Sequence, residues 1–149
     1  DEIDGDVWTV PAENMKARLG AAQDFRVPLS EEALAVIDLA RPFERDGFLF
    51  PSVRKGVISD ATMARLMERK GMEARPHGFR SSLRTWLAET TDAPHEVAEA
   101  MLAHMTDNKV VRTYRQTDYL DRRRILLERW SDYVTGGPVN VLKFTGRMP

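Results

Sequence analysis

The first 28 residues show the alternation of apolar and polar positions that is typical of short β-strands. From Ile3 to Val10 the two kinds of position alternate around an Asp-Gly pair, a common signal for a tight hairpin turn. The β-branched and aromatic run 7–10 favours a strand. The segment 25–28 resembles a returning strand that ends at its proline, because proline has no N–H to donate to a ladder. This pattern predicts a small antiparallel sheet of two to three strands.

The rest of the chain has helical periodicity, with apolar positions that recur every three or four residues. The positions expected to face inward are Leu34, Ile37 and Ala40 in a helix capped by Ser30; Met63, Leu66 and Met67 in a helix that begins at Ser59 or Asp60 and stops at Gly71; Phe79, Leu83, Trp86 and Leu87 in a helix from Pro76; Val97, Ala98, Met101 and Leu102 in a helix from Pro94; and Leu126, Trp130, Tyr133 and Val134 in a long helix from Tyr119 to about Val134. A short helix is expected around 108–115. The predicted fold class is α+β and mostly α, a small antiparallel sheet followed by a helical bundle.

The long helix should end at the Gly-Gly-Pro run 136–138, which divides the chain into a folded unit, 1–136, and a tail, 137–149. The tail contains the apolar run VNVLKF, which can pair as a strand and could dock on the edge of a sheet. We therefore expect one domain with a short carboxyl-terminal docking segment.

Composition is ordinary for a globular domain, with 42% hydrophobic and 30% charged residues in 149. There are no cysteines, which excludes disulfides and thiolate chemistry. No apolar run approaches the roughly 20 residues that a membrane helix needs, so no membrane partner is expected. The opening DEIDGD has none of the features of a signal peptide.

Charge is unevenly distributed although the net charge is only −1. Residues 1–64 hold 7 basic and 12 acidic side chains, a net charge of −5, and residues 65–149 hold 15 and 11, a net charge of +4. A basic half can carry a phosphate-facing surface. On charge alone, an ordinary solvated surface explains the asymmetry better.

Three polar side chains share one face of the helix predicted from Pro76. His77 and Arg80 are one turn apart, and Arg84 extends the same ridge opposite the apolar stripe. An arginine can hold two oxygens of a phosphodiester while a histidine moves a proton. Taken alone, the spacing H-x-x-R fits a solvated histidine and a surface arginine better.

Tyr114 lies ten residues after His104 and is flanked by Arg112 and Arg115. A tyrosine hydroxyl, with a pKa near ~10, becomes a useful nucleophile only when cationic neighbours stabilise its anion. The alternative is a tyrosine with its ring in the core and its hydroxyl in water. Lys16, in the loop between two predicted strands, could reach a DNA groove and protonate a leaving oxygen, or it could simply be solvated.

The remaining candidates have unremarkable interpretations. His95 follows Pro94 at a helix start and is expected at the surface. The three histidines have no metal-ligand spacing, so no metal site is expected. The run Arg122-Arg123-Arg124 is expected to be a solvated helix face, with DNA contact as an alternative.

The order of these segments carries more information than any one of them. The runs WTVPAENMK, RVPLS, HGFRSSLRTWLAE, LAH and TYRQTDYLDRRRILLERWSDYV resemble the integrases of bacterial prophages and genomic islands, within the tyrosine recombinase superfamily. The resemblance extends from Asp1 to about Val134. A histidine common in the family just before VPLS is replaced here by Phe25-Arg26.

The resemblance assigns roles by position. Tyr114, in the run TYRQ, matches the nucleophile of the family. It would attack a DNA phosphodiester and form a 3′-phosphotyrosyl link that releases a 5′-hydroxyl. Arg80 and His77 in H-x-x-R would stabilise the phosphoryl oxygens and assist proton transfer, and His104 would donate to a nonbridging oxygen. Lys16 matches the lysine of the β-hairpin and would protonate the leaving oxygen. Arg84, Arg112 and Arg115 are candidate DNA contacts, and no cofactor is implied.

The family has an earlier arginine, in an R-x-x-E setting upstream of the segment that matches WTVP, and no arginine here takes that place by alignment. The resemblance therefore implies that residues 1–136 are a partial tyrosine recombinase catalytic domain, inactive as a fragment. The implied partner is double-stranded DNA at attachment sites, bound by a homo-oligomer, a tetramer in the full protein, with accessory DNA-bending proteins. The implied location is the bacterial cytoplasm, at the nucleoid.

Three other functions remain open at this point. A type IB topoisomerase uses the same covalent chemistry to relax DNA. A non-catalytic DNA-binding module would account for the basic half alone. A hydrolase of small phosphate esters would use histidine and arginine similarly, without a protein-linked product.

Overall fold

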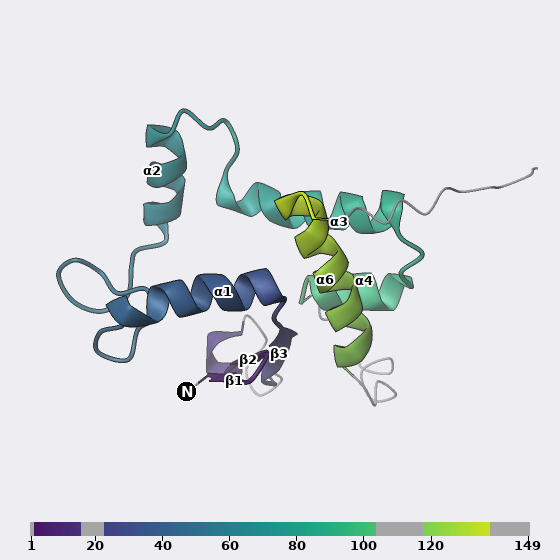
Figure 1. The fold of residues 1–149 in the computed structure, drawn as a ribbon, viewed down its shortest axis with the longest axis horizontal. Helices are drawn as coiled ribbons and strands as arrows, with labels where there is room; N and C mark the ends of the chain where they lie inside the picture. Colours follow the sequence, from purple (N-terminus) through teal and green to yellow (C-terminus); the bar gives the residue numbers. More distant parts are fainter. Residues whose placement is uncertain (1, 16–22, 104–117, 138–149) are drawn as a thin grey trace, which may run out of the picture.

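The structure is a computed structural model that describes residues 2–15, 23–103 and 118–137. The helix predicted around 108–115 and the tail after Gly137 lie outside the described residues. The described chain forms a small sheet at the amino terminus followed by helices, of which α3, α4 and α6 pack together while α2 stands apart from them (Figure 1). The expected α+β, mostly α fold class is confirmed.

The sheet has three antiparallel strands in the order β1-β2-β3. These are β1, Ile3–Asp4, β2, Val7–Val10, and β3, Phe25–Pro28. The Asp-Gly pair makes the turn between β1 and β2, where the glycine has a φ of 56°. β2 pairs along its whole length with β3, with Val10 opposite Phe25. The strands match the hairpin and the returning strand expected from the alternation.

The helices begin and end close to their sequence signals. They are α1, Glu31–Ala40; α2, Ala61–Arg69; α3, Pro76–Thr90; α4, His95–Met101; and α6, Leu120–Thr135, with single-turn 3-10 helices at Ala12–Asn14 and Arg41–Phe43. The hydroxyl of Ser30 accepts a hydrogen bond from the Ala33 N–H at 3.3 Å, which confirms the expected cap. Gly71 and Gly136 end α2 and α6 in the left-handed conformation, with φ of 70° and 75°. α2 begins after Asp60, one of the two expected capping positions, but no side chain caps it: the Asp60 carboxylate makes no cap bond, and the Ser59 hydroxyl bonds to the Thr62 hydroxyl.

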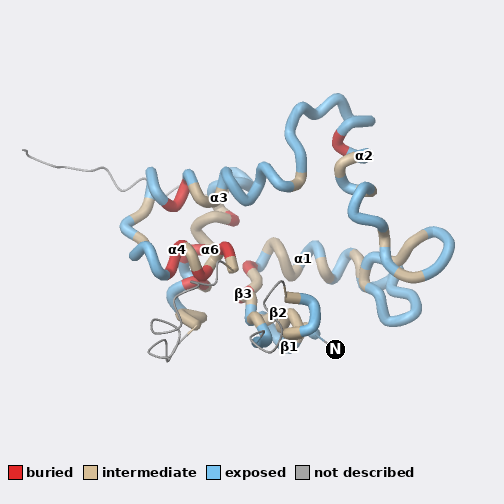
Figure 2. The backbone as a smooth tube through the Cα atoms, turned by 180° about the vertical axis from the view of Figure 1, so that it is seen from behind, coloured by how far each residue is buried: buried red, intermediate tan, exposed pale blue. Residues whose placement is uncertain are grey.

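The core lies where α3, α4 and α6 meet (Figure 2). Its buried members are Trp86, Leu87, Val97, Ala98 and Leu126. Trp130 packs edge-on against the Trp86 ring, with ring centroids 5.3 Å apart. These positions were all predicted to face inward, so three of the expected apolar stripes do meet in one core.

Five predicted core residues are instead exposed, although one of them, Tyr133, lies at the edge of the core, with its ring centroid 6.0 Å from that of Trp86 and 5.7 Å from that of Trp130. Phe79, Met63, Leu66, Tyr133 and Val134 have between 42% and 56% of their surface accessible. Among the described residues, the contribution of α3 to the core begins at Leu83, beyond Phe79. α2 buries only Met67. Helical periodicity predicts which face of a helix is apolar, but it cannot predict how much of that face other helices cover.

Polar contacts join α6 to the elements that precede it. The Ser131 hydroxyl bonds to the Glu32 carboxylate, and the Ser30 hydroxyl donates to Ser131 at 3.1 Å, so the start of α1 is tied to α6. The Arg124 guanidinium forms an ion pair with Asp6, beside the sheet. α6 is therefore fixed against both α1 and the amino-terminal hairpin.

Candidate active site

The structure describes three of the eight residues predicted to act on or bind DNA. His77, Arg80 and Arg84 lie on α3. The other five, Lys16, His104, Arg112, Tyr114 and Arg115, lie outside the described residues. The geometry of the site is therefore built from α3 and from the described residues on either side of 104–117.

The loop before α3 is arranged by one arginine. The Arg75 guanidinium donates to three successive carbonyl oxygens, those of residues 72, 73 and 74, at 2.9 to 3.0 Å. Pro76 then occupies the first helical position, which suits its fixed φ and missing N–H. His77 and Arg80 follow on the first turns of α3, both exposed and one turn apart. The predicted pairing of these two side chains on one exposed helix face is consistent with this placement.

Arg80 lies against the end of α4. Its guanidinium donates a hydrogen bond to the carbonyl oxygen of Leu102, the residue that caps α4. Ala103 follows in the left-handed conformation, with φ of 51°. A guanidinium has five N–H donors, and the bond to Leu102 uses one of them, so the same group can still hold phosphate oxygens. The structure thus brings Arg80 of H-x-x-R against Leu102, the first residue of the L-A-H segment, 22 residues further along the chain.

Arg84, one turn further along α3, forms an ion pair with α4. Its Nε donates to Oε1 of Glu99 at 3.2 Å, and Nε2 of His95 lies 3.8 Å from the same oxygen. His95 is exposed, as expected. Glu99 thus partly offsets the charge of Arg84, which was predicted to contact DNA.

One buried arginine was missed by the sequence interpretation. Arg123 was expected on a solvated face, together with its two arginine neighbours, but only 1% of its surface is accessible. A signal was present in the sequence, because Arg123 lies four residues after Tyr119 and three before Leu126, within the inward stripe of α6. The expectation of a solvated face rested on the run of three arginines and did not take the inward position of Arg123 into account.

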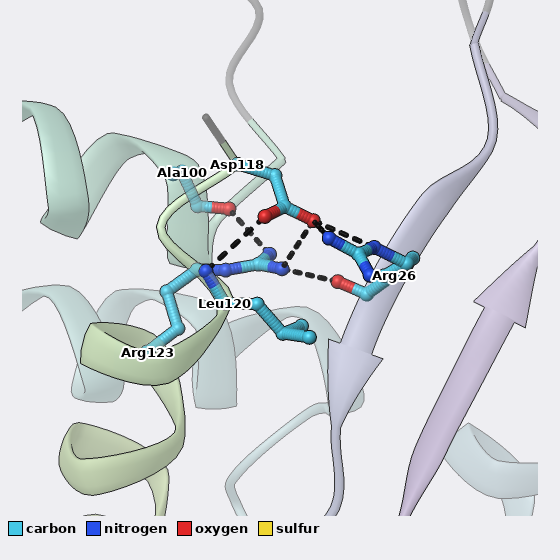
Figure 3. A network of polar contacts seen from close by, with 5 residues as sticks. All are labelled: Arg26, Ala100, Asp118, Leu120 and Arg123. Atoms are coloured by element: carbon cyan, nitrogen blue, oxygen red, sulfur yellow. Dashed lines mark hydrogen bonds and ion pairs between the residues drawn. The ribbon is translucent and has the colours of Figure 1, made fainter. Parts of the chain in front are cut away.

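Arg123 is buried among polar groups from three elements (Figure 3). Its guanidinium donates to the carbonyl oxygen of Arg26 on β3 and, at 3.5 Å, to that of Ala100 on α4. Its Nη2 also lies 4.0 Å from the Asp118 carboxylate, and the guanidinium stacks over the Phe25 ring at 4.8 Å. Burial of a guanidinium is tolerated only where such partners replace its water.

Asp118 completes this network from the start of α6. It accepts two hydrogen-bonding contacts from the Arg26 guanidinium, at 2.9 Å from Nε and 2.8 Å from Nη2. Its other oxygen accepts from the Leu120 N–H at 3.2 Å. Arg26 and Asp118 are 50% and 36% exposed. The result is an arginine–carboxylate–arginine arrangement that joins β3, α4 and α6.

Within 2–15, 23–103 and 118–137, no group of three or more histidine, aspartate or glutamate side chains is arranged to hold a metal ion. No helix among these residues is long and apolar enough to cross a membrane.

Comparisons of the sequence with known proteins identify its relatives. Residues 2–120 match the model of the phage integrase family. Over 141 residues the chain is 37% identical to the prophage integrase IntA of Escherichia coli K12, which covers 90% of this chain and 33% of that protein. It is 24% identical over 139 residues to the integrase of Shigella phage Sf6, with 89% and 35% covered. The chain therefore spans about a third of the length of these relatives, and no solved structure matches it.

Proposed function

The chain belongs to the phage integrase family, and from that premise we propose that it is the catalytic portion of a tyrosine recombinase that integrates and excises a mobile element. The reaction is DNA strand cleavage and rejoining through a 3′-phosphotyrosyl intermediate. The observation that supports this proposal best is the contact between Arg80 and Leu102, because it holds one predicted catalytic residue against the chain two residues before another, His104.

In the proposed cleavage step, the Tyr114 hydroxyl passes its proton to His77 as its oxygen forms a bond to phosphorus, and the bond from phosphorus to the 5′ oxygen breaks. Lys16 supplies a proton to that leaving oxygen. The forked donors of Arg80 bind two nonbridging oxygens as their charge grows, assisted by His104 and by His77. Rejoining reverses these steps with a different 5′-hydroxyl, so the phosphotyrosyl ester stores the energy of the original bond.

The partners proposed for the intact protein follow from this chemistry. Two duplexes must exchange strands, so we propose double-stranded attachment-site DNA as substrate and a homotetramer on DNA as the active assembly, aided by accessory DNA-bending proteins. The site of action would be the bacterial nucleoid. Residues 1–136 would be part of the catalytic domain, and the tail 137–149 would dock on a neighbouring copy.

A covalent-adduct experiment tests this function. A full-length integrase that contains this chain is incubated with a nicked suicide substrate, and protein-linked DNA is resolved on a denaturing gel. The expected result is that Tyr114→Phe abolishes the adduct while DNA affinity stays close to that of the unchanged protein. Tyr133→Phe, on the exposed end of α6, is the matched control and should leave the adduct unchanged.

An adduct formed by Tyr114→Phe would contradict the assignment of Tyr114 as nucleophile. An adduct lost only in Tyr133→Phe would assign that role to Tyr133. Relaxation of supercoiled DNA without site preference would favour a topoisomerase instead. DNA binding with no adduct from the unchanged protein would favour a module that only binds DNA.

A further inference from the structure

Asp118 is the first described residue after the segment 104–117, and it lies four residues after Tyr114 in the sequence. Its carboxylate is held from two sides, by the guanidinium of Arg26 at 2.8 and 2.9 Å and by the start of α6 at 3.2 Å (Figure 3). The contact with Arg26 spans 92 residues of sequence. The point at which the tyrosine-bearing segment joins α6 is therefore attached to the sheet.

The residue after Asp118 adds a second constraint. Tyr119 adopts the left-handed conformation, with φ of 56°, which costs a side-chain-bearing residue about 1–2 kcal/mol. Its ring packs against the core formed by α3, α4 and α6. Since a strained backbone persists only where surrounding contacts impose it, the direction of the chain at Asp118 and Tyr119 is determined by tertiary contacts.

The other flank of the same segment is held by the same network. Leu102, two residues before His104, accepts from Arg80, and Ala100 accepts from Arg123. Arg123 therefore contacts the chain on both sides of 104–117, because it also lies 4.0 Å from Asp118. The two ends of the segment predicted to carry His104 and Tyr114 are fixed relative to each other by a buried guanidinium.

We propose that Arg26 and Asp118 are positioning residues for the tyrosine nucleophile, and that their ion pair sets the place from which the Tyr114 oxygen attacks. This inference rests on the proposed function. Four residues of chain reach at most about 14 Å, so the anchor at Asp118 limits how far the tyrosine can lie from the Arg26–Asp118 ion pair. A displacement of about 1 Å can cost roughly 10²-fold in rate.

The size of the expected effects on stability and on cleavage rate distinguishes a positioning role from simple stabilisation. The Arg26–Asp118 pair is partly exposed, and such pairs contribute only about 0–1 kcal/mol to stability. Loss of Arg26 should therefore leave the protein folded; Asp118→Asn also weakens the 4.0 Å contact with the buried Arg123 and should cost somewhat more stability. A large fall in cleavage rate, with little change in melting temperature, would then come from geometry.

The test uses Arg26→Gln and Asp118→Asn in a full-length integrase that contains this chain. Adduct formation is measured in single turnovers at saturating DNA, together with DNA affinity and melting temperature. Each variant should form adduct roughly 10 to 10² times more slowly. Arg41→Gln is the matched control, because it removes an equally exposed arginine and a surface ion pair with Asp38 at 3.5 Å, and it should leave the rate unchanged.

Two further measurements identify the cause. The double variant should be no slower than the slower single variant, because both changes remove the same contact. Arg26→Lys, which keeps the charge, should recover most of the rate. With a substrate whose leaving 5′ oxygen is replaced by sulfur, the phosphorus–sulfur bond breaks without a proton donor; the defect should persist, whereas a defect in proton donation would disappear.

An unchanged adduct rate in both single variants would overturn the inference. So would multiplicative slowing in the double variant, or slowing that saturating DNA removes. A defect in Arg26→Gln without one in Asp118→Asn would show that Arg26 contacts DNA directly. Tyr114→Phe keeps the two proposals apart: if it still forms adduct, the proposed nucleophile fails, and if only the Arg26 and Asp118 variants behave as the unchanged protein, the positioning role alone fails.

Discussion

The guanidinium of Arg80 donates to the carbonyl oxygen of Leu102, 22 residues further along the chain. This bond fixes the exposed arginine of α3 against the end of α4, where the chain continues towards His104. A preorganised donor of this kind loses less entropy when a phosphate binds than a mobile surface arginine would. In the proposed reaction, the contact would link the packing of two helices to the binding of the scissile phosphate.

The first prediction concerns the fork of Arg80. Arg80→Lys keeps the charge but replaces the planar fork by a single nitrogen, which cannot face Leu102 and align with two phosphate oxygens as a guanidinium can. In a full-length integrase we expect adduct formation to fall about 10²–10³-fold, the usual loss for one transition-state donor. DNA affinity should change little. The same substitution at Arg69, exposed on α2, is the control, and a normal rate in Arg80→Lys would contradict this role.

The second prediction concerns Ala103. Its φ of 51° is strained for a residue with a Cβ by about 1–2 kcal/mol, whereas glycine loses roughly 0.5–1 kcal/mol more entropy on folding. Ala103→Gly should therefore raise the free energy of unfolding slightly, by up to about 1 kcal/mol. Ala103→Val should lower it, because a β-branched residue fits this conformation poorly. Urea denaturation would measure both, and a clear loss of stability in Ala103→Gly would contradict the left-handed conformation.

Local signals in the sequence were sufficient for the elements of this fold. The alternation around the Asp-Gly pair predicted β1 and β2, and Ser30, Pro76 and Gly136 marked helix ends where the structure has them. Each of these signals acts within a few residues. Burial was predicted less well, as Phe79 shows, because it depends on where other helices end.

For the candidate site, too, local features could be predicted from the sequence and long-range contacts could not. The spacing of His77 and Arg80 follows from one turn of helix, and the sequence was enough to predict it. The contacts of Arg80 with Leu102 and of Arg26 with Asp118 join residues 22 and 92 positions apart, so no local pattern indicates them. Arg123 lies between these cases: its position in the α6 stripe was visible, but the carbonyl oxygens that make its burial tolerable come from β3 and α4.

The third prediction concerns pH and Glu128 on α6. Burial raises the pKa of the Glu128 carboxyl, and the neighbouring Glu31, Glu32 and Asp132 carboxylates raise it further. A folded-state pKa above the unfolded value means that ionised Glu128 destabilises the fold at neutral pH, and that this cost disappears as pH falls below the unfolded value.

Glu128→Gln removes the charge and keeps an oxygen that can accept the backbone hydrogen bond of Glu31. Its melting temperature should therefore exceed that of the unchanged chain at pH 7. The difference should shrink as pH falls through the raised pKa and vanish below about 4. Glu89→Gln, exposed on α3, is the control and should show no such pH dependence. A difference that grows towards acid pH would have the wrong sign and would contradict the burial of Glu128.

The last prediction separates the buried arginine of α6 from its exposed neighbour. Arg123→Met keeps the length of the side chain but leaves the carbonyl oxygens of Arg26 and Ala100, and one contact of the Asp118 carboxylate, without their guanidinium. Removal of one partner from a buried polar network costs about 3 kcal/mol or more. Arg122→Met makes the same chemical change at an exposed position and should alter stability by no more than about 0.5 kcal/mol. Chemical denaturation of the two variants compares them directly. Equal stabilities would show that Arg123 lies in solvent, and the network that joins β3, α4 and α6 would then have to be abandoned together with the positioning role built on it.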